Sequence, residues 1–253
     1  MAKDAKSAFC EDSRVKFPTL MHLMGMGFKY VSLKGLKTKY VEAPKTEFDP
    51  LTNILTDYFT DAYCTLNPKA EKKDAEDMLV KIQKSLQNDD LGRQFYNEIL
   101  LNTGERIIDL SSPANFYRNN TFQVTTEMTC GSKDSDNYRP DITIFVNGLP
   151  LAFIEVKKEN NHKGIQAETD RMKQRFVNPQ YRRFLNITQI MVFSNDMEYD
   201  NNEVTPTIGA FYATIGKKST KYNCFREEGQ DSFPTARHIH QVTPEEEEVL
   251  LRD

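Results

Sequence analysis

Two carboxylates and one lysine in a β-rich stretch have the types and spacing of a metal-dependent hydrolytic site. Asp141 opens one predicted strand, and Glu155 follows fourteen residues later, two residues ahead of Lys157. Mg²⁺ prefers oxygen ligands and is usually bound by one or two carboxylates together with water and substrate phosphate. A lysine ammonium can orient the attacking water and stabilise charge that grows on the phosphate. These residues predict metal-assisted phosphodiester hydrolysis, and the alternative is a solvent-facing Glu-Lys pair that ends a strand.

The elements that must position these residues are two strands of a predicted hairpin. Residues 141–146 and 149–156 are rich in β-branched and aromatic side chains, and Asn147-Gly148 between them is a strong signal for a tight turn. Side chains alternate between the two faces of a strand, so Glu155 and Lys157 share one face. The register of the hairpin then decides which face Asp141 takes.

Two registers are compatible with the sequence. A two-residue loop would pair Asp141 with Ile154 and place its carboxylate on the face opposite to Glu155. A three-residue loop with a bulge at Gly148 would pair Asp141 with Phe153, which leaves Asp141 diagonal to Glu155 at about 7–8 Å on one face. On this reasoning, only the odd-length loop lets both carboxylates reach one metal ion.

The remaining pattern predicts helices before the hairpin and alternating elements after it. Apolar residues at helical spacing predict a helix that starts at Asp49-Pro50, a second after Asn67-Pro68, and a third from about Asp89 to Asn102. Further predictions are a strand from Thr121, a loop at 131–138, a helix at 163–176, and strands at 189–194 and 208–215. Together these elements indicate an α+β or α/β domain whose mixed sheet is covered by helices.

Charge is distributed unevenly along the chain. The 253 residues carry a net charge of −4, which argues against a protein that coats nucleic acid by charge alone. Residues 157–183 nevertheless contain eight basic and three acidic residues, whereas 245–248 are all glutamate. A local basic surface is compatible with a DNA site confined to one face, and a solvated helix face is the alternative.

No signal in the sequence directs the chain to a membrane or an oxidising compartment. No window approaches the roughly 18 consecutive apolar residues of a membrane span, and the charged N-terminus lacks an apolar signal core. The four cysteines are at least 54 residues apart and form no CxxC pair, so thiols are favoured over a disulfide framework or a zinc site. We therefore expect a cytoplasmic protein without a membrane partner.

The hairpin sequence resembles a known nuclease family. Residues 139–158, RPDITIFVNGLPLAFIEVKK, are similar to the PD-(D/E)xK nuclease core in the N-terminal domain of the restriction (R) subunit of type I restriction-modification enzymes. The NGLPL turn is far more specific than the three catalytic letters. The similarity extends to residues 66–68 and 93–95 upstream and to 189–195 downstream, and it spans roughly 47–195. It implies the restriction-endonuclease-like α/β (α+β) fold, with a mixed sheet flanked by helices.

The resemblance implies a set of metal ligands. Asp141, Glu155 and Lys157 match the metal-binding and catalytic triad of the family, with the main-chain carbonyl of Val156 as a further ligand of Mg²⁺. The family also has an acid on the helix before the sheet, and Asp89 is the best counterpart here. Glu98 is the alternative, and an ordinary capping or exposed acid is an equally good interpretation of either residue.

The resemblance also points to DNA contacts after the lysine. Related nucleases carry Gln-x-x-x-Tyr on the following helix, a motif that this sequence lacks. One of two glutamines, Gln166 or Gln174, could substitute for the glutamine of the motif. Basic residues provide candidate phosphate contacts along the same segment: Lys158, Lys163, Arg171 and Arg175.

The resemblance implies a function within a larger complex. We expect residues 1–253 to be a single endonuclease domain of a longer restriction subunit, with about 1–45 as an N-terminal extension. No GxxxxGK[ST] phosphate loop occurs, so ATP would act only through a motor region missing from this sequence. The expected function is Mg²⁺-dependent cleavage of double-stranded DNA without base recognition, together with methyltransferase (M) and specificity (S) subunits. The alternative, favoured by the net charge and the missing glutamine motif, is a non-catalytic DNA-binding or subunit-docking module.

Overall fold

A computed structural model describes most of the chain. The described residues are 15–35, 46–102, 104–130, 138–157, 164–194, 210–215, 220–224 and 240–253. Within them, the side chains of 164–166, 169, 210–215 and 220–224 are outside the description.

A mixed seven-stranded sheet forms the centre of the fold, and its strands are ordered β1 to β7 as in the sequence. The β1–β2 and β4–β5 pairs are parallel, and the other neighbours are antiparallel. The parallel β4–β5 pair requires a crossover, which residues 164–187 provide as helices. The strands are β1 (Lys29–Tyr30), β2 (Phe122–Thr126), β3 (Ile142–Val146), β4 (Leu149–Val156), β5 (Ile190–Ser194), β6 (Ala210–Ile215) and β7 (Thr220–Cys224).

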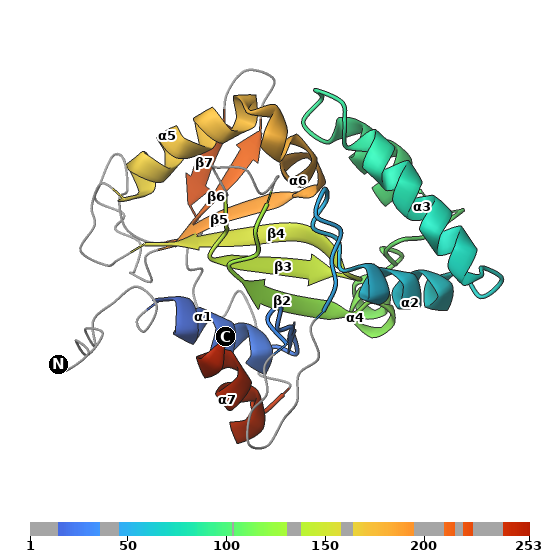
Figure 1. The fold of residues 1–253 in the computed structure, drawn as a ribbon, viewed down its shortest axis with the longest axis horizontal. Coiled ribbons are helices and arrows are strands. Elements are labelled where there is room, and N and C mark those ends of the chain that lie inside the picture. The colour runs from blue at the N-terminus through green and yellow to red at the C-terminus, as the bar shows by residue number, and fades with distance from the viewer. Residues whose placement is uncertain are drawn as a thin grey trace.

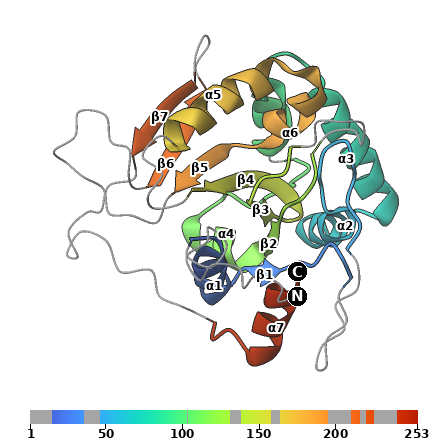
Figure 2. The ribbon, with the colours of Figure 1, turned by 60° about the vertical axis from the view of Figure 1, so that its left-hand side comes forward.

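Helices surround this sheet on three sides. Figure 1 shows α5 and α6 along one side, α1 and α7 on the other, and α2 and α3 beyond one end of the strands, and the turned view in Figure 2 agrees. The mixed sheet flanked by helices confirms the predicted α/β fold class. The helices are α1 (Phe17–Gly25), α2 (Thr56–Leu66), α3 (Lys72–Ser85), the π-helix η2 (Phe95–Leu100), α4 (Pro113–Asn119), α5 (Gly164–Val177), the 3₁₀-helix η3 (Pro179–Tyr181), α6 (Arg182–Ile187) and α7 (Pro244–Arg252).

Alternation along β4 divides the core between the two faces of the sheet. Phe153 faces α5 and α6, where it packs with Met172 and Phe184. Ile154, the next residue, belongs to the cluster on the opposite face, which includes Leu20 of α1 and Leu250 of α7. Because Glu155 follows in the same alternation, its side chain lies on the α5 face.

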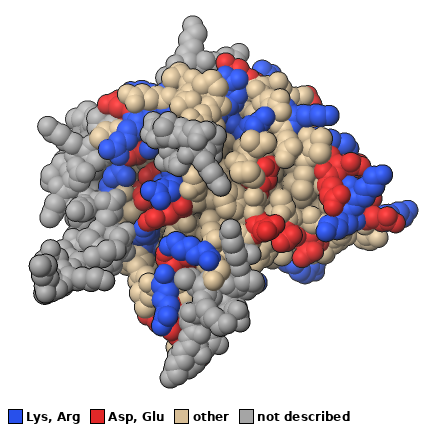
Figure 3. All heavy atoms as spheres, in the orientation of Figure 1, with Lys and Arg blue, Asp and Glu red and all other residues tan. Residues whose placement is uncertain are grey.

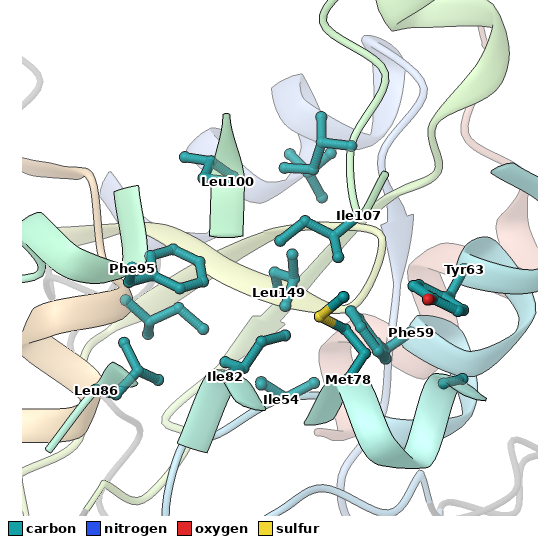
Figure 4. Close-up of a cluster of buried hydrophobic side chains, with 14 residues drawn as sticks. Ile54, Phe59, Tyr63, Met78, Ile82, Leu86, Phe95, Leu100, Ile107 and Leu149 are labelled. Atoms are coloured by element: carbon teal, nitrogen blue, oxygen red, sulfur yellow. The ribbon is translucent and has the colours of Figure 1, made fainter. Parts of the chain in front are cut away.

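A third core cluster joins the helical layer to the tip of the β3–β4 hairpin. Figure 4 shows Leu149 of β4 among side chains from α2, α3 and η2, including Phe59, Ile82 and Phe95. All four of these residues have side chains that are fully buried. This packing explains why the apolar hairpin tip is enclosed rather than exposed as a surface turn.

The Asn147-Gly148 turn is fixed by its neighbours. Both residues have positive φ, 53° and 75°, as a two-residue hairpin turn requires. A Cβ atom added to Gly148 would lie 2.6 Å from the carbonyl oxygen of Leu55 and 2.8 Å from the backbone nitrogen of Phe59. The tip therefore requires glycine both for its conformation and for its close contact with α2.

Helix α2 begins later than predicted, at Thr56 instead of Asp49-Pro50. Asp49 does accept hydrogen bonds from Leu51 N and Thr52 Oγ1, at 3.0 and 2.7 Å, but they close a turn and not a helix. Asn53 then has a φ of 62°, which interrupts any helix. The turn chemistry of Asp49 therefore gives the same sequence signal as a helix N-cap.

The second and third predicted helices also have shorter bounds. Helix α3 begins at Lys72, where Glu71 and Asp74 form a capping box, and not directly after Asn67-Pro68. Leu91 and Gly92 have positive φ values, which are incompatible with a helix, so the third helix cannot begin at Asp89. Its assigned π-helical segment is η2, Phe95–Leu100. Gly92 has no room for a side chain, because an added Cβ would lie 2.0 Å from the carbonyl oxygen of Asn186.

Both ends of the described chain pack on the β1 side of the sheet. Strand β1 pairs in parallel with β2, so part of the predicted N-terminal extension belongs to the sheet. Tyr30 donates a hydrogen bond to Asp253 Oδ2 at 2.8 Å, and burial raises the pKa of Tyr30 far above its ordinary value. The C-terminal helix α7 starts with a capping box formed by Thr243 and Glu246. These contacts bring segments more than 200 residues apart in sequence into one layer.

The described helices and cysteines can be compared with the sequence analysis. Among the described residues, no helix has both the length and the apolar character needed to cross a bilayer. Cys64 and Cys130 are free thiols, and Cys130 is buried. Cys10 and the side chain of Cys224 lie outside the described residues.

Candidate active site

A bulge in the β3–β4 hairpin sets the register on which the site depends. The turn has two residues, but the pairing shifts between Ile144 and Phe145, which leaves Leu151 of β4 without a partner in β3. Beyond the bulge, Ile142 pairs with Ile154. Pro150, next to the extra residue, has no N–H to donate, and prolines within sheets are confined to edges, strand starts and bulges.

The bulge brings Asp141 and Glu155 to the same face. Continuing the register by one residue beyond Ile154 places Asp141 opposite Glu155, and residues opposite each other share a face. Both pairings derived from loop length were therefore wrong, because Asp141 is opposite neither Ile154 nor Phe153. The extra residue that unites the carboxylates lies within β4 and not in the turn.

Asp141 is tied to the end of β4 by a hydrogen bond. Its Oδ2 atom accepts from the backbone N–H of Val156 at 2.8 Å, and its carbonyl oxygen accepts from Glu127 N at 3.2 Å. The Asp141 side chain is half-buried, directly before β3. These contacts fix one carboxylate next to the Glu155–Lys157 segment.

Glu155 is a buried carboxylate in a repulsive environment, with a residue exposure of 5%. Desolvation raises its pKa to about 8, and the negative charges of Asp141 and Glu168 add to this effect. The positive charge of Lys157 acts in the opposite direction. A divalent cation between Asp141 and Glu155 would remove the main source of this repulsion.

Lys157 points back toward the same acids. Its Nζ atom donates a hydrogen bond to the Val156 carbonyl at 2.9 Å and lies 3.7 Å from Glu155 Oε2. A third contact, 3.4 Å long, reaches Glu168 Oε2 on α5. The lysine side chain is only 13% exposed, so its ammonium is held at the site and not in bulk solvent.

Helix α5 contributes an acid, Glu168, that the sequence reasoning did not assign. Glu168 is 1% exposed, and Arg175 Nη1 donates to its Oε1 at 2.7 Å. The same Arg175 nitrogen lies 3.9 Å from Glu155 Oε1, and the guanidinium stacks 3.8 Å above the Tyr138 ring. A detectable signal was available for Glu168, because Arg171 and Arg175 follow it at helical spacing. No sequence pattern singled out Tyr138.

Several buried polar atoms around Glu155 are unsatisfied. Glu155 Oε1, Tyr138 Oη and Thr143 Oγ1 meet no partner at full hydrogen-bond geometry within the described residues. The Tyr138 hydroxyl is nevertheless close enough to the Glu155 carboxylate to lower the pKa of the acid slightly, against the larger effect of burial. Burial and the charge of Glu155 also raise the pKa of Tyr138 well above its ordinary value. An unpartnered buried carboxylate oxygen beside Asp141 fits the donor set that a hard divalent cation prefers. The residues present therefore fit a Mg²⁺ ion held by two carboxylates.

A comparison with protein families places this site in a known context. The model of the family described as Type I restriction enzyme R protein N terminus matches residues 9–204. The chain belongs to this family. No curated protein matches the chain.

The R protein N-terminal match covers the whole candidate site. The matched span includes the β3–β4 hairpin, α5 and β5, whereas β6, β7 and α7 follow it. Family membership confirms the resemblance that residues 139–158 indicated, and it supports a nuclease-like role in restriction.

The structure does not bring the predicted upstream acid to the site. Asp89 lies in the turn after α3, with a side chain 82% exposed and its Oδ1 atom 4.0 Å from Arg182 Nη2. Glu98, the alternative, lies on η2 and accepts a hydrogen bond from Gln94 Nε2 at 2.9 Å. No group of three or more His, Cys, Asp or Glu suited to a metal occurs among the described residues. Asp89 therefore does not join Asp141 and Glu155 in this structure, and the prediction fails because sequence order alone does not fix where a turn residue lies relative to the sheet.

The two arginines predicted to contact DNA have different environments. Arg171 has a side chain 63% exposed, and it pairs with Glu168 Oε2 at 3.2 Å. Arg175 is 21% exposed and is engaged by Glu168, Glu155 and Tyr138. Arg171 is thus accessible to a phosphate, whereas Arg175 belongs to the interior of the site.

The other predicted DNA contacts are only partly described. Gln174 is exposed on α5, as a DNA-contacting residue would be. Gln166 lies on the same helix, but its side chain is outside the description. Lys158 and Lys163 lie outside the described residues. Their roles stay predictions.

The visible surface has no extended field of one sign. Figure 3 shows Lys and Arg side chains interspersed with Asp and Glu on the face seen in Figure 1. Such a surface gives little nonspecific attraction for a polyanion over a distance. Any DNA contact of this face would therefore depend on individual cations and not on a broad basic surface.

Proposed function

We propose that the chain is a Mg²⁺-dependent endodeoxyribonuclease domain of a type I restriction enzyme, which hydrolyses phosphodiester bonds of duplex DNA without reading bases. The single observation that carries the proposal is the bulge that sets Asp141 opposite Glu155, with Lys157 on the same face. Family membership supports the restriction context.

Asp141 and Glu155 are the residues that would hold the metal. The Val156 carbonyl, which accepts a hydrogen bond from Lys157 Nζ at 2.9 Å, stays a predicted further ligand. Asp141 is oriented by Val156 N, and Glu155 offers the unpartnered Oε1 atom. When bound, Mg²⁺ would supply charge stabilisation at the phosphate and lower the pKa of a coordinated water. With a pKa near 8, Glu155 must release a proton when it binds a cation at neutral pH. Metal affinity should therefore rise with pH up to about 8.

Lys157 has the position of a group that acts on the reacting phosphate. Its ammonium is enclosed and lies within 4 Å of Glu155, so it adjoins the position that the carboxylates define. An ammonium there donates hydrogen bonds to the attacking water or to a non-bridging phosphate oxygen. Water oxygen forms the new bond to phosphorus, one P–O ester bond breaks, and the leaving oxygen takes up a proton.

Metal binding by the 253-residue chain is the most direct test. We expect calorimetric titration to show a Mn²⁺ or Mg²⁺ site in the wild type that Asp141→Asn and Glu155→Gln weaken at least about tenfold, since each loses one charged ligand. Asp61→Asn, which neutralises an exposed acid on α2, is the matched control and should bind like the wild type. Equal binding by all four proteins would contradict the proposal.

Cleavage by an assembled restriction complex tests the chemistry. Introducing Asp141→Asn or Lys157→Met into the R subunit should reduce DNA cleavage about 100-fold or more, as loss of a transition-state contact does. ATP hydrolysis is the internal control, because we propose that it belongs to a motor region outside this sequence. Wild-type cleavage by the Asp141→Asn complex would refute the assignment.

The proposed partners follow from the restriction context. They are double-stranded DNA and the methyltransferase and specificity subunits, with base recognition assigned to the specificity subunit. A cytoplasmic location also stays a prediction. Copurification of the three subunits would test the assembly.

One observation favours a second candidate, a non-catalytic DNA-binding or docking module. Glu155, Lys157, Glu168 and Arg175 pair with one another, as a purely structural charge network would. Such a module requires no metal. Intact assembly of the complex together with the absence of Mn²⁺ binding by the chain would favour it.

A further inference from the structure

Glu168 is the most enclosed charged residue at the candidate site, and neither the resemblance nor the family match gives it a role. Its side chain is 1% exposed, although Asp170, Arg171 and Lys173 next to it on α5 are exposed. A buried carboxylate is costly unless cations and hydrogen bonds compensate it. Three cations do so here: Lys157, Arg171 and Arg175.

Two of these cations lie between Glu168 and Glu155. Lys157 Nζ is 3.4 Å from Glu168 Oε2 and 3.7 Å from Glu155 Oε2. Arg175 Nη1 is 2.7 Å from Glu168 Oε1 and 3.9 Å from Glu155 Oε1. The four side chains form a closed arrangement in which each acid faces both cations and each cation is closer to Glu168.

As a result, the two cations make their closest contacts with Glu168 and only longer ones with Glu155. Arg175 donates its hydrogen bond to Glu168 and only approaches Glu155, whose Oε1 atom has no hydrogen-bond partner within the described residues. Arg175 is further held by the Tyr138 ring and by Met172 Sδ at 3.4 Å. Without Glu168, the nearest carboxylate for both cations would be Glu155.

We infer that Glu168 is a positioning residue of the site, whose carboxylate draws Lys157 and Arg175 away from Glu155 and so keeps Glu155 available to a divalent cation. This inference rests on the proposed function, because it gives Glu168 a purpose only if Glu155 binds metal. Glu168 itself is not proposed as a ligand, since no three-acid metal group occurs among the described residues.

The inference predicts that the position of the Glu168 carboxylate matters as well as its charge. Glu168→Gln keeps the shape but loses the charge, and Glu168→Asp keeps the charge but withdraws it by one methylene from both cations. In either variant the cations turn toward Glu155 and compete with the metal. If Glu168 only attracted the metal through its negative charge, Glu168→Asp would keep the wild-type metal affinity. If Glu168 served folding alone, its substitution would change the free energy of unfolding without changing metal affinity.

Calorimetric titration of the full 253-residue chain with Mn²⁺ tests this. We expect about tenfold weaker binding for Glu168→Gln and a several-fold loss for Glu168→Asp, as for a directly coupled neighbour. Asp170→Asn is the matched control, because Asp170 lies on the same helix in an exposed pair with Lys173. It should bind Mn²⁺ within about twofold of the wild type.

Nitrogen-15 spectra of the lysine ammonium groups give a metal-free readout. A buried, hydrogen-bonded Lys157 should give an ordered Nζ signal, identified by its loss in Lys157→Met. The signal should shift or broaden in both Glu168 variants and persist in Asp170→Asn. Because Lys157 Nζ lies 3.4 Å from Glu168, any change at residue 168 moves the signal, and the decisive comparison adds Glu155→Gln to Glu168→Gln. A further shift in the double variant would show that Lys157 had turned to Glu155, and no further shift would contradict the inference.

The outcomes separate the inference from the function on which it rests. Failure of the wild type to bind Mn²⁺ would overturn both. Binding that Glu155→Gln removes but Glu168→Asp leaves at the wild-type value would overturn the inference alone. Loss of the folded state in both Glu168 variants, seen by circular dichroism, would also overturn it, because Glu168 would then be a requirement of the fold.

Discussion

The two ends of the β3–β4 hairpin differ in how far their buried polar side chains are hydrogen-bonded. At the tip, Asn147 Oδ1 accepts from Thr121 N at 2.8 Å, and its Nδ2 donates to Ile107 O and Asn120 Oδ1 at 2.9 and 2.8 Å. At the open end, Glu155 Oε1 is buried without a hydrogen-bond partner among the described residues. The same pair of strands thus joins a fully hydrogen-bonded buried amide to an unsatisfied buried acid.

The pKa values of the carboxylates near the two ends also shift in opposite directions. Asp109, connected to the tip through Asn120, accepts hydrogen bonds from Ser111 and Asn119, and these lower its pKa to about 2. Desolvation and like charges raise the pKa of Glu155 to about 8. The tip therefore stabilises the fold, whereas the open end keeps an electrostatic repulsion that a ligand can relieve.

The largest effect in this comparison should come from Gly148→Ala at the tip. The new Cβ would contact backbone atoms of Leu55 and Phe59 at a residue with positive φ, so we expect a loss of about 4 kcal/mol or more in the free energy of unfolding. Urea unfolding followed by circular dichroism measures it. Gly104→Ala is the control, because its φ is not positive and an added Cβ would lie 3.3 Å from a single exposed side-chain atom, Asn102 Oδ1, so it should cost less than about 1 kcal/mol. Equal losses of unfolding free energy in Gly148→Ala and Gly104→Ala would show that the hairpin tip is not tightly packed.

Glu155→Gln should stabilise the metal-free chain in a pH-dependent way. The folded state keeps a proton on Glu155 up to about pH 8, whereas the unfolded state loses it near 4.5, so this residue lowers stability progressively as pH rises through that window. The variant should equal the wild type near pH 5 and exceed it by up to about 4 kcal/mol at pH 9, at 1.36 kcal/mol per pH unit. Unfolding is measured with a chelator present. A stability difference that does not change with pH would contradict the repulsion at the open end.

Asp109→Asn should cause the smallest change in the free energy of unfolding, and the change should be a loss where Glu155→Gln gives a gain. Because the pKa of Asp109 is lowered to about 2, its ionised form contributes stability that is complete above about 3.8 and is lost as pH falls through 2. The variant should be less stable than the wild type at pH 7 and approach it near pH 2. Thermal unfolding at both pH values measures the difference. A variant that is more stable at neutral pH would remove the contrast with Glu155.

Some features of the fold and site followed from local sequence. The Asn147-Gly148 turn and the strands on each side could be predicted, because positive φ and period-two alternation are local properties. Helix starts were less accurate, since Asp49 forms a turn with the same chemistry as a helix N-cap. The bulge at Leu151 had one indication, Pro150, whose missing donor is tolerated where a ladder is interrupted.

The sequence by itself determined the family, the mixed α/β architecture and the identity of the residues proposed to act: Asp141, Glu155 and Lys157. Tertiary structure alone decided that the two acids share a face, that Asp89 stays away from them, and that Glu168 enters the site from α5. The physical reason is the distance along the chain over which each interaction acts. Turn and strand preferences act over a few residues, whereas register beyond a bulge and the burial of a charge depend on packing between elements distant in the chain.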